Sequence, residues 1–245
     1  MNTLSLTRVQ CETGASDVLH TTNTEVALSI LTGSCTVVVT DSCRRRQFTN
    51  LGNRLDVFSG LPTTLLLGPG VGFQVITETS VDILVAKFEQ PTYKELPTTL
   101  IRPDDVMVHQ VGRGNMARTV RQVVSDQHCP YSIRMGETVN PPGNWSSFPP
   151  HHFEVGATGN EDFEEYFFYV VRPRHGTAVQ VRKGYFPNNE AVNDTVLIQN
   201  GDILPIPLGY HPVVAAPDTE VFYGWCYVGP EKVYAESATD GGNYK

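Results

Sequence analysis

Short apolar runs, broken at close intervals by turn residues, constrain the fold of this chain more than any other feature. In the second half, Gly, Pro, Asn and Asp separate such runs, which occupy residues 163–171, 177–183, 194–199, 202–206 and 220–228. Helical periodicity is scarce throughout, and short strands with closely spaced turns are typical of a sandwich or a barrel. We therefore expect an all-β protein.

The first 90 residues show the same pattern. Glu25–Thr40 holds two β-branched runs around a Thr-Gly-Ser turn, which predicts a β-hairpin. Residues 55–77 alternate apolar runs with Gly-Leu-Pro and Gly-Pro-Gly, which mark turns between short strands. Residues 81–88 predict a further strand.

Two small barrels fit the length of 245 residues better than one large sandwich. Gln90–Arg102 carries two prolines among polar residues and is expected to be a connector. We therefore expect one domain over residues 1–95 and a second over residues 96–245. No exact internal repeat is legible, so this duplication is predicted from the pattern of strands.

Charge and composition exclude several classes of function. The formal net charge of −8 argues against nucleic acid or an anionic membrane as a partner, and an acidic ligand would need a local basic group. No apolar run has the length that a bilayer requires, and the first residues lack the layout of a signal peptide. The five cysteines form no CxxC motif and are expected to be reduced thiols. We therefore expect a cytoplasmic protein.

The stretch from residue 144 to 169 concentrates groups that can bind a metal ion. It contains two adjacent histidines, His151 and His152, and two adjacent carboxylates, Glu164 and Glu165. Imidazole and carboxylate together suit a divalent ion such as Zn, Mn, Fe or Ni. The sequence therefore predicts one such ion in the second barrel.

A third histidine, His211, follows an apolar run downstream in the segment Gly-Tyr-His-Pro. Pro212 favours an extended backbone at His211, which would present the imidazole rigidly. This residue is a candidate metal ligand, and the alternative is a structural histidine that is partly buried and hydrogen-bonded.

Strand geometry limits how many of these groups can enter one pocket. Neighbouring residues of a strand point to opposite faces, so only one of Glu164 and Glu165 can point inward. The same limit applies to His151 and His152 unless a bulge intervenes. The residue two positions after His151 is Phe153, so there is no His-x-His pair. Three protein ligands with open positions would still be a catalytic arrangement.

Motifs along most of the chain resemble one known family. In the second half they are NWSSFPP with His151, FEEYFFY, GDILPIPLGYHPVVAAP and VFYGWCYVGP, and in the first half VALSILTGSCTV, RLDVFSGLPTTLLLGPG and IRPDDVMVHQVGRGN. These motifs resemble the bicupin isomerase family of inositol catabolism. That family is 5-deoxy-glucuronate isomerase, related in fold to the 4-deoxy-5-hexulose-uronate isomerases.

The resemblance implies a bicupin fold of two double-stranded β-helix (jelly-roll) barrels, with a divalent metal only in the C-terminal barrel. Matched position by position, the metal ligands would be His151, Glu165 and His211, with His152 as a further candidate. The second histidine of the family's pair falls on Phe153. Three other family positions, two basic and one asparagine, fall on Val181, Leu208 and Trp225.

The resemblance also implies an activity. A metal-dependent aldose–ketose isomerase would convert a deoxy sugar acid similar to 5-deoxy-glucuronate from an aldehyde into a ketone. Tyr223 and Glu164 are the candidate proton carriers. A sugar acid also requires a cation for its carboxylate, and the candidates are Arg182, Lys183 and Arg174.

Two other functions stay open. The lost ligand and basic positions favour a cupin that binds a sugar acid without turning it over. The apolar replacements Phe153, Leu208 and Trp225 favour a metal-dependent cupin enzyme with a different, less acidic substrate. In each case the expected partner is a small molecule, and exposed sheet edges favour a homo-oligomer.

Overall fold

The computed structural model describes residues 4–41, 44–89, 95–128, 130–148, 163–186, 188 and 190–229. Strands dominate these residues. The helical elements among them are the single 3₁₀ turns η1 (Pro103–Asp105), η2 (Gly114–Met116) and η3 (Asp126–His128). No helix in this part of the chain is long and apolar enough to cross a membrane. The predicted all-β class is confirmed.

The chain divides into two compact units. The first consists of Met1–Met107 and Arg121–Gly136, and the second of Val108–Val120 and Glu137–Lys245.

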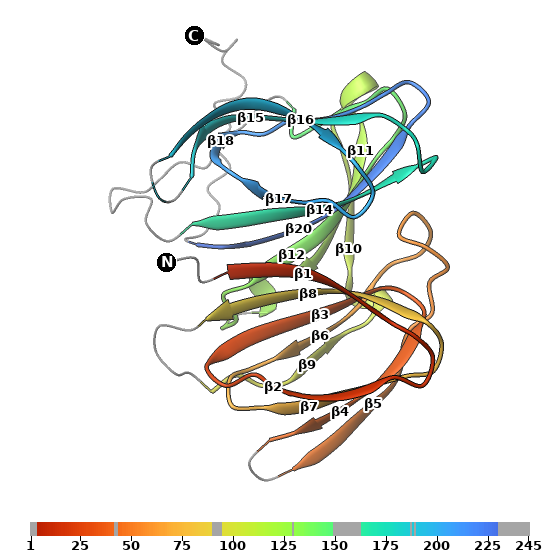
Figure 1. The fold of residues 1–245 in the computed structure, drawn as a ribbon, viewed down its shortest axis with the longest axis vertical. Coiled ribbons are helices and arrows are strands. Elements are labelled where there is room, and N and C mark those ends of the chain that lie inside the picture. Colours follow the sequence, from red (N-terminus) through yellow and green to blue (C-terminus); the bar gives the residue numbers. More distant parts are fainter. Residues whose placement is uncertain are drawn as a thin grey trace. The chain divides into compact units, whose positions relative to one another are not determined.

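Two antiparallel sheets form the N-terminal unit, with the orders β1-β8-β3-β6-β9 and β2-β7-β4-β5. Figure 1 shows these two sheets facing each other. Neighbours in each sheet are mostly distant in sequence, which is the connectivity of a jelly roll. The strands are β1 (Leu4–Cys11), β2 (Ser16–His20), β3 (Thr24–Thr32), β4 (Ser34–Thr40), β5 (Arg45–Gly52), β6 (Thr63–Leu67), β7 (Gly72–Thr77), β8 (Val81–Glu89) and β9 (Thr99–Ile101).

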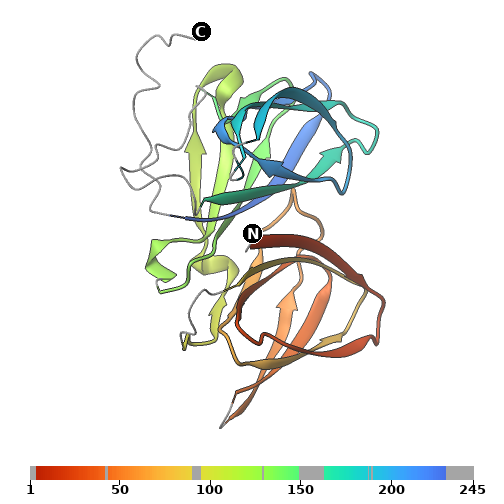
Figure 2. The same cartoon turned by 60° about the vertical axis from the view of Figure 1, so that its left-hand side comes forward.

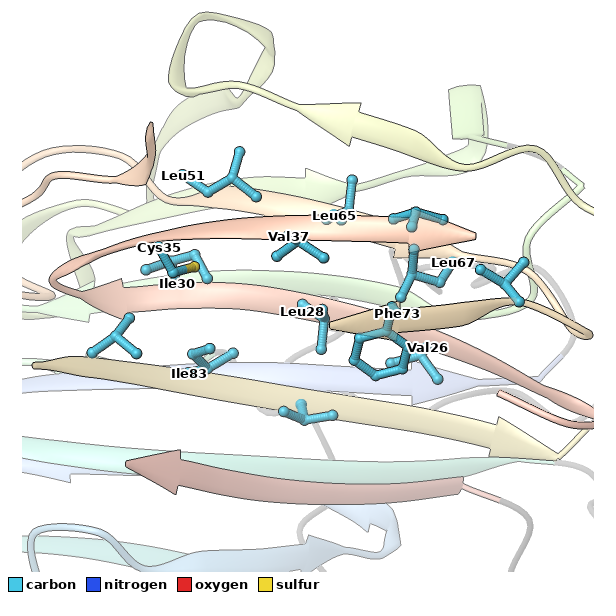
Figure 3. Packing of buried hydrophobic residues seen from close by; sticks show 14 residues of the cluster. Val26, Leu28, Ile30, Cys35, Val37, Leu51, Leu65, Leu67, Phe73 and Ile83 are labelled. Carbon is cyan, nitrogen blue, oxygen red and sulfur yellow. The ribbon is translucent and has the colours of Figure 1, made fainter. Parts of the chain in front are cut away.

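Alternating aliphatic residues fill the space between these sheets. Val26, Leu28 and Ile30 of β3 point to the same side, and Val37 and other residues of β4 meet them across the core. Figure 3 shows this packing. Because β-branched residues suit the pleated strand and bury well, the sequence pattern specifies both the strands and the core.

The hairpin predicted within Glu25–Thr40 is wrong. β3 lies in the five-stranded sheet and β4 in the four-stranded sheet, so the two runs do not pair with each other. Gly33 lies between them with φ of +79°, and a Cβ at this position would lie 2.2 Å from the carbonyl oxygen of Ser80. The close approach at this glycine lets the chain turn from one sheet to the other, and both runs then bury their apolar faces against the same core.

The remaining strands form two further sheets, with the orders β10-β11-β12-β20-β14-β17 and β13-β19-β15-β16, and β18 also pairs with β15. Figures 1 and 2 show β14, β17 and β20 facing β15, β16 and β18. The strands are β10 (Met107–Val111), β11 (Arg118–Val124), β12 (Arg134–Asn140), β13 (Trp145–Ser146), β14 (Glu164–Arg172), β15 (Ala178–Tyr185), β16 (Ala191–Ile198), β17 (Ile203–Ile206), β18 (Leu208–Tyr210), β19 (Val213–Ala215) and β20 (Glu220–Val228).

The interior of the C-terminal unit is more aromatic than that of the first. Its core cluster includes Phe167, Tyr169 and Tyr223, with Trp225 packed against it. Phe167 and Tyr169 come from β14, and the two others come from β20, which pairs with β14 along its whole length. Rings from two adjacent strands therefore form one wall of this barrel.

One buried carboxylate offers a test of the N-terminal unit. Glu25 is 0% exposed, and its carboxylate accepts hydrogen bonds from the backbone N–H of Ser132 at 2.8 Å and of Ile133 at 3.1 Å. Hydrogen bonds to a charged group contribute about 1.5–3 kcal/mol. We expect Glu25→Gln to lower the free energy of unfolding in urea by about 2 kcal/mol, because the new amide turns an N–H₂ group toward N–H donors. Glu89→Gln, at an exposed carboxylate of β8, is the control. Equal stability of the two variants would contradict this account.

Candidate functional site

β14 determines which of the two adjacent glutamates enters the barrel. Glu165 is 3% exposed and lies on the same face of the strand as Phe167 and Tyr169, which belong to the core cluster. Glu164 lies on the opposite face and is partly exposed. Glu165 is therefore the carboxylate that the strand directs into the interior.

His211 lies between β18 and β19 and is 2% exposed. Its ring meets the ring of Phe167 edge-on, with centroids 5.8 Å apart and planes at 82°. Phe167 follows Glu165 by two positions on the same face of β14. One aromatic ring therefore links the surroundings of the two candidate ligands.

The hydrogen bond of the His211 ring fixes its tautomer. Nδ1 lies 2.9 Å from the carbonyl oxygen of Gly209. A carbonyl oxygen can only accept a hydrogen bond, so the neutral ring carries its proton on Nδ1. Nε2 then carries the lone pair. Metal-binding histidines commonly have this arrangement, in which one ring nitrogen binds the ion and the N–H of the other donates to a backbone carbonyl.

Gly209 is a site residue that the sequence reasoning missed. Its φ is +141°, and a Cβ here would lie 2.2 Å from the carbonyl oxygen of Lys183. Leu208, just before this glycine, packs with Phe163, and His211, just after it, packs on Phe167. Only glycine fits this close approach of β18 to β15, and the glycine next to the tyrosine and histidine was the available signal.

Tyr223 joins the same cluster from β20. It is buried, pairs with Tyr169, and stacks on Phe167 with ring centroids 4.8 Å apart. Trp225, two positions further on, lies opposite Phe167 in the strand register and stacks on Tyr227. The candidate proton carrier Tyr223 thus lies with the candidate ligands, and Glu164 does not.

The pKa of the Tyr169 hydroxyl depends on its burial and on the charged groups near it. Burial raises the pKa of Tyr169 well above its usual value, and the nearby Tyr223 and Glu165 raise it further, whereas Arg182 opposes the shift. The hydroxyl therefore stays protonated and neutral at physiological pH.

Arg182 comes from β15, on the same face as the buried Gln180. Its Nε and Nη2 donate to the two carboxylate oxygens of Asp194 at 2.9 and 2.6 Å. This pairing holds the pKa of the Asp194 carboxyl below its usual value. Arg182 therefore faces the interior with its guanidinium already engaged by a carboxylate.

The other two candidate cations lie elsewhere. Lys183 is exposed on the opposite face of β15, where it lines an open cavity of about 550 Å³ together with residues of β16 and β18. Arg174 is exposed in the turn that follows β14, and Glu165 lies near the other end of that strand. The structure therefore brings only Arg182 of the three toward Glu165 and His211.

The histidines of the predicted metal set, His151 and His152, lie outside the described residues, as does Phe153. Among the residues that are described, no group of three or more His, Cys, Asp or Glu could hold a metal ion. Glu165 and His211 supply a buried carboxylate and an imidazole of the tautomer that binds through Nε2. This pair of donors fits a divalent ion of the Zn, Mn, Fe or Ni type as part of a larger set.

Comparison with known proteins gives relatives along almost the whole chain. The profile of the KduI/IolB family matches residues 1–240. A 5-deoxy-glucuronate isomerase of Geobacillus thermodenitrificans is 29% identical over 219 residues, which are 88% of this chain and 76% of the relative. A protein of the same name from Shouchella clausii is 32% identical over 202 residues, which are 81% of this chain and 72% of the relative.

Solved structures give relatives of the same kind. The crystal structure of an IolB-like protein from Salmonella typhimurium LT2 superposes with a TM-score of 0.82 at 25% identity, covering 94% of this chain and 85% of the other. The oxalate decarboxylase of Lactobacillus farciminis has a TM-score of 0.66 at 14% identity, over 94% of this chain and 78% of the other, and shares the fold alone. These structures confirm the predicted bicupin fold class, and the chain belongs to the KduI/IolB family.

Proposed function

We propose that this protein is a metal-dependent aldose–ketose isomerase that acts on a deoxy sugar acid similar to 5-deoxy-glucuronate. The observation that supports this most is the burial of Glu165 and His211 beside Phe167, with the imidazole held in its Nδ1-protonated form. The names of the relatives agree with an isomerase of this kind.

His211 through Nε2 and Glu165 through its carboxylate would hold the ion, with His151 and His152 as the further predicted ligands. A bound divalent ion would supply a Lewis acid that polarises the carbonyl and neighbouring hydroxyl oxygens of the substrate. A buried carboxylate is costly unless it is paired or metal-bound, so this role accounts for a glutamate at the end of an aromatic strand.

Isomerisation requires two proton movements. One proton leaves the carbon that bears the hydroxyl and reaches the aldehyde carbon, and the hydroxyl proton moves to the aldehyde oxygen, so that aldose and ketose keep the same atoms. Tyr223 is the better of the two candidate proton carriers, because it is buried in the same aromatic cluster as His211. Glu164 is disfavoured because it lies on the other face of β14.

Arg182 is the proposed cation for the substrate carboxylate, since it shares the interior face of β15. Because the guanidinium of Arg182 already binds the carboxylate of Asp194, a substrate carboxylate would share that guanidinium with Asp194. The same pairing favours a second candidate function, a metal-dependent cupin enzyme with a less acidic substrate. The two functions differ in whether the carboxylate of the sugar contributes to binding.

Removal of one imidazole tests the metal site. We expect the wild-type protein, purified without chelator, to contain close to one equivalent of a divalent metal, and His211→Ala to weaken its binding by about 100-fold or more. His175→Ala, at an exposed histidine in the turn after β14, is the matched control and should retain the metal. Elemental analysis and titration of the apoprotein provide the measurement. Unchanged metal content in His211→Ala would show that this residue is not a ligand.

Removal of one hydroxyl tests the proton carrier. Tyr223→Phe keeps the ring stacked on Phe167, and we expect kcat for the deoxy sugar acid to fall by about 100-fold or more, with metal content unchanged. Tyr185→Phe, at an exposed tyrosine of β15, should leave kcat near that of the wild type. A Tyr223→Phe enzyme of normal kcat would remove this residue from the proposal.

A pair of substrates separates the two candidate functions. We expect Arg182→Met to raise KM for the sugar acid by about 10-fold or more, because a cation that pairs with a carboxylate contributes about 1.5–3 kcal/mol. The matching neutral deoxy sugar should show no such increase. If the wild-type enzyme turns over the neutral sugar as well as the acid, and Arg182→Met affects both equally, the less acidic substrate is favoured.

A further inference from the structure

Gln180 is a buried amide in the wall of the C-terminal barrel with no role in the site described above. It is 0% exposed and lies near the start of β15. Its Nε2 donates to the carbonyl oxygen of His211 at 2.8 Å and lies 3.2 Å from that of Pro212, and it is also 2.8 Å from the oxygen of Val181. A side chain of β15 therefore binds the main chain of the candidate metal ligand.

The need for this amide follows from a break in the sheet. β15 pairs with β18 through Lys183 and Tyr210, and with β19 through Gln180 and Val213. His211 and Pro212 lie between these two strands and belong to neither.

Pro212 has no backbone N–H, so it cannot donate a hydrogen bond to β15. The N–H of Val181 still donates to the carbonyl of Pro212 at 2.9 Å. The Gln180 side chain adds donors at the point where the ladder is interrupted. It therefore holds a segment that strand pairing alone leaves less constrained.

Tyr169 and the backbone carbonyls together orient the Gln180 amide toward His211. The Tyr169 hydroxyl donates to Oε1 of Gln180, and both side chains are fully buried. The carbonyl oxygens around the other end of the amide can only accept, so that end must be the nitrogen, and the oxygen is left as the acceptor for this hydroxyl. The amide nitrogen is thereby turned toward the carbonyls of His211 and Pro212.

Two separate contacts then fix His211. Gln180 holds its main chain from β15, and the carbonyl of Gly209 holds Nδ1 of its ring. With the backbone and one ring nitrogen both held, the direction of Nε2 is determined before any ligand arrives. Outer residues of this kind commonly change metal affinity by about 10- to 100-fold.

We propose that Gln180, oriented by the hydroxyl of Tyr169, is a positioning residue that aims Nε2 of His211 and so sets the affinity of the barrel for a divalent metal ion. This inference rests on the proposed function for its metal, although the contacts themselves do not involve one. Gln180 acts through His211 and has no chemical step of its own.

The test compares Gln180→Met and Tyr169→Phe with the wild type, using Co²⁺ as a spectroscopic probe. Methionine keeps most of the volume and removes both hydrogen-bonding ends of the amide, and phenylalanine removes only the group that orients it. We expect Co²⁺ affinity to fall by between about 10- and 100-fold in Gln180→Met and by less in Tyr169→Phe, with an altered visible spectrum in both. Gln199→Met, at an exposed glutamine between β16 and β17, is the control.

A purely structural role for Gln180 would lower stability in urea and leave the affinity and spectrum of the folded protein unchanged, and that result would overturn the proposal. If Gln180→Met does not fold, Tyr169→Phe decides the question by the same two readouts.

The experiment also separates this proposal from the proposed function. If the wild type binds no divalent ion, the metal function fails, and ¹⁵N chemical shifts of the His211 ring in the metal-free protein decide the positioning role. Shifts that report loss of the Nδ1-protonated form in Gln180→Met would support positioning, and unchanged shifts would overturn it. If the wild type binds Co²⁺ and neither variant changes the Co²⁺ affinity or spectrum, the positioning role is overturned and the metal function stands.

Discussion

The alternation of side chains along a strand governs which groups can meet inside each barrel. Along β14 this alternation sends Glu165 and Phe167 inward, and along β15 it sends Gln180 and Arg182 inward. Between β18 and β19 the chain presents His211 to Phe167, and Gly209 lets β18 approach β15 closely just before it. The candidate site therefore depends on two regular strands and on a segment whose close approach to β15 at Gly209 leaves no room for a Cβ.

Burial makes the chemistry of these groups depend on their neighbours. Aromatic rings line the wall from which Glu165 projects, and in such surroundings a charge interacts more strongly with other charges than it does in water. The same surroundings disfavour an isolated carboxylate. Arg182 brings its own counterion, Asp194, so it adds less positive charge to the interior than a lone arginine would. A cation held by Glu165 together with a neutral imidazole would offset the burial of the carboxylate, and the fixed tautomer of His211 agrees with that requirement.

Features that depend on local pattern could be predicted from the sequence, and features that depend on distant contacts could not. The strands that bear Glu165 and Tyr223 follow from apolar alternation, and parity shows that only one of two adjacent glutamates can point inward. The failed hairpin between β3 and β4 has a non-local cause, because each strand pairs with partners far away in sequence. The engagement of Arg182 by Asp194 depends on the register of β15 and β16, which no local pattern reveals. The same holds for the bond from Gln180 to His211.

The two barrels share an architecture and differ in what fills them. In the N-terminal unit the core is mainly aliphatic, burial raises the pKa of Cys35 to about 12, and backbone amides hold the buried carboxylate of Glu25. The Cys35 thiol is thus kept neutral, and the Glu25 carboxylate is bound within the fold. In the C-terminal unit the core is more aromatic, and a carboxylate from β14, an amide from β15 and the imidazole of the segment between β18 and β19 enter it. A fold does not determine a function, so any functional difference between the two units must come from their interior side chains. In the second unit, hydrogen bonds hold His211 from two sides, at its main chain and at Nδ1 of its ring.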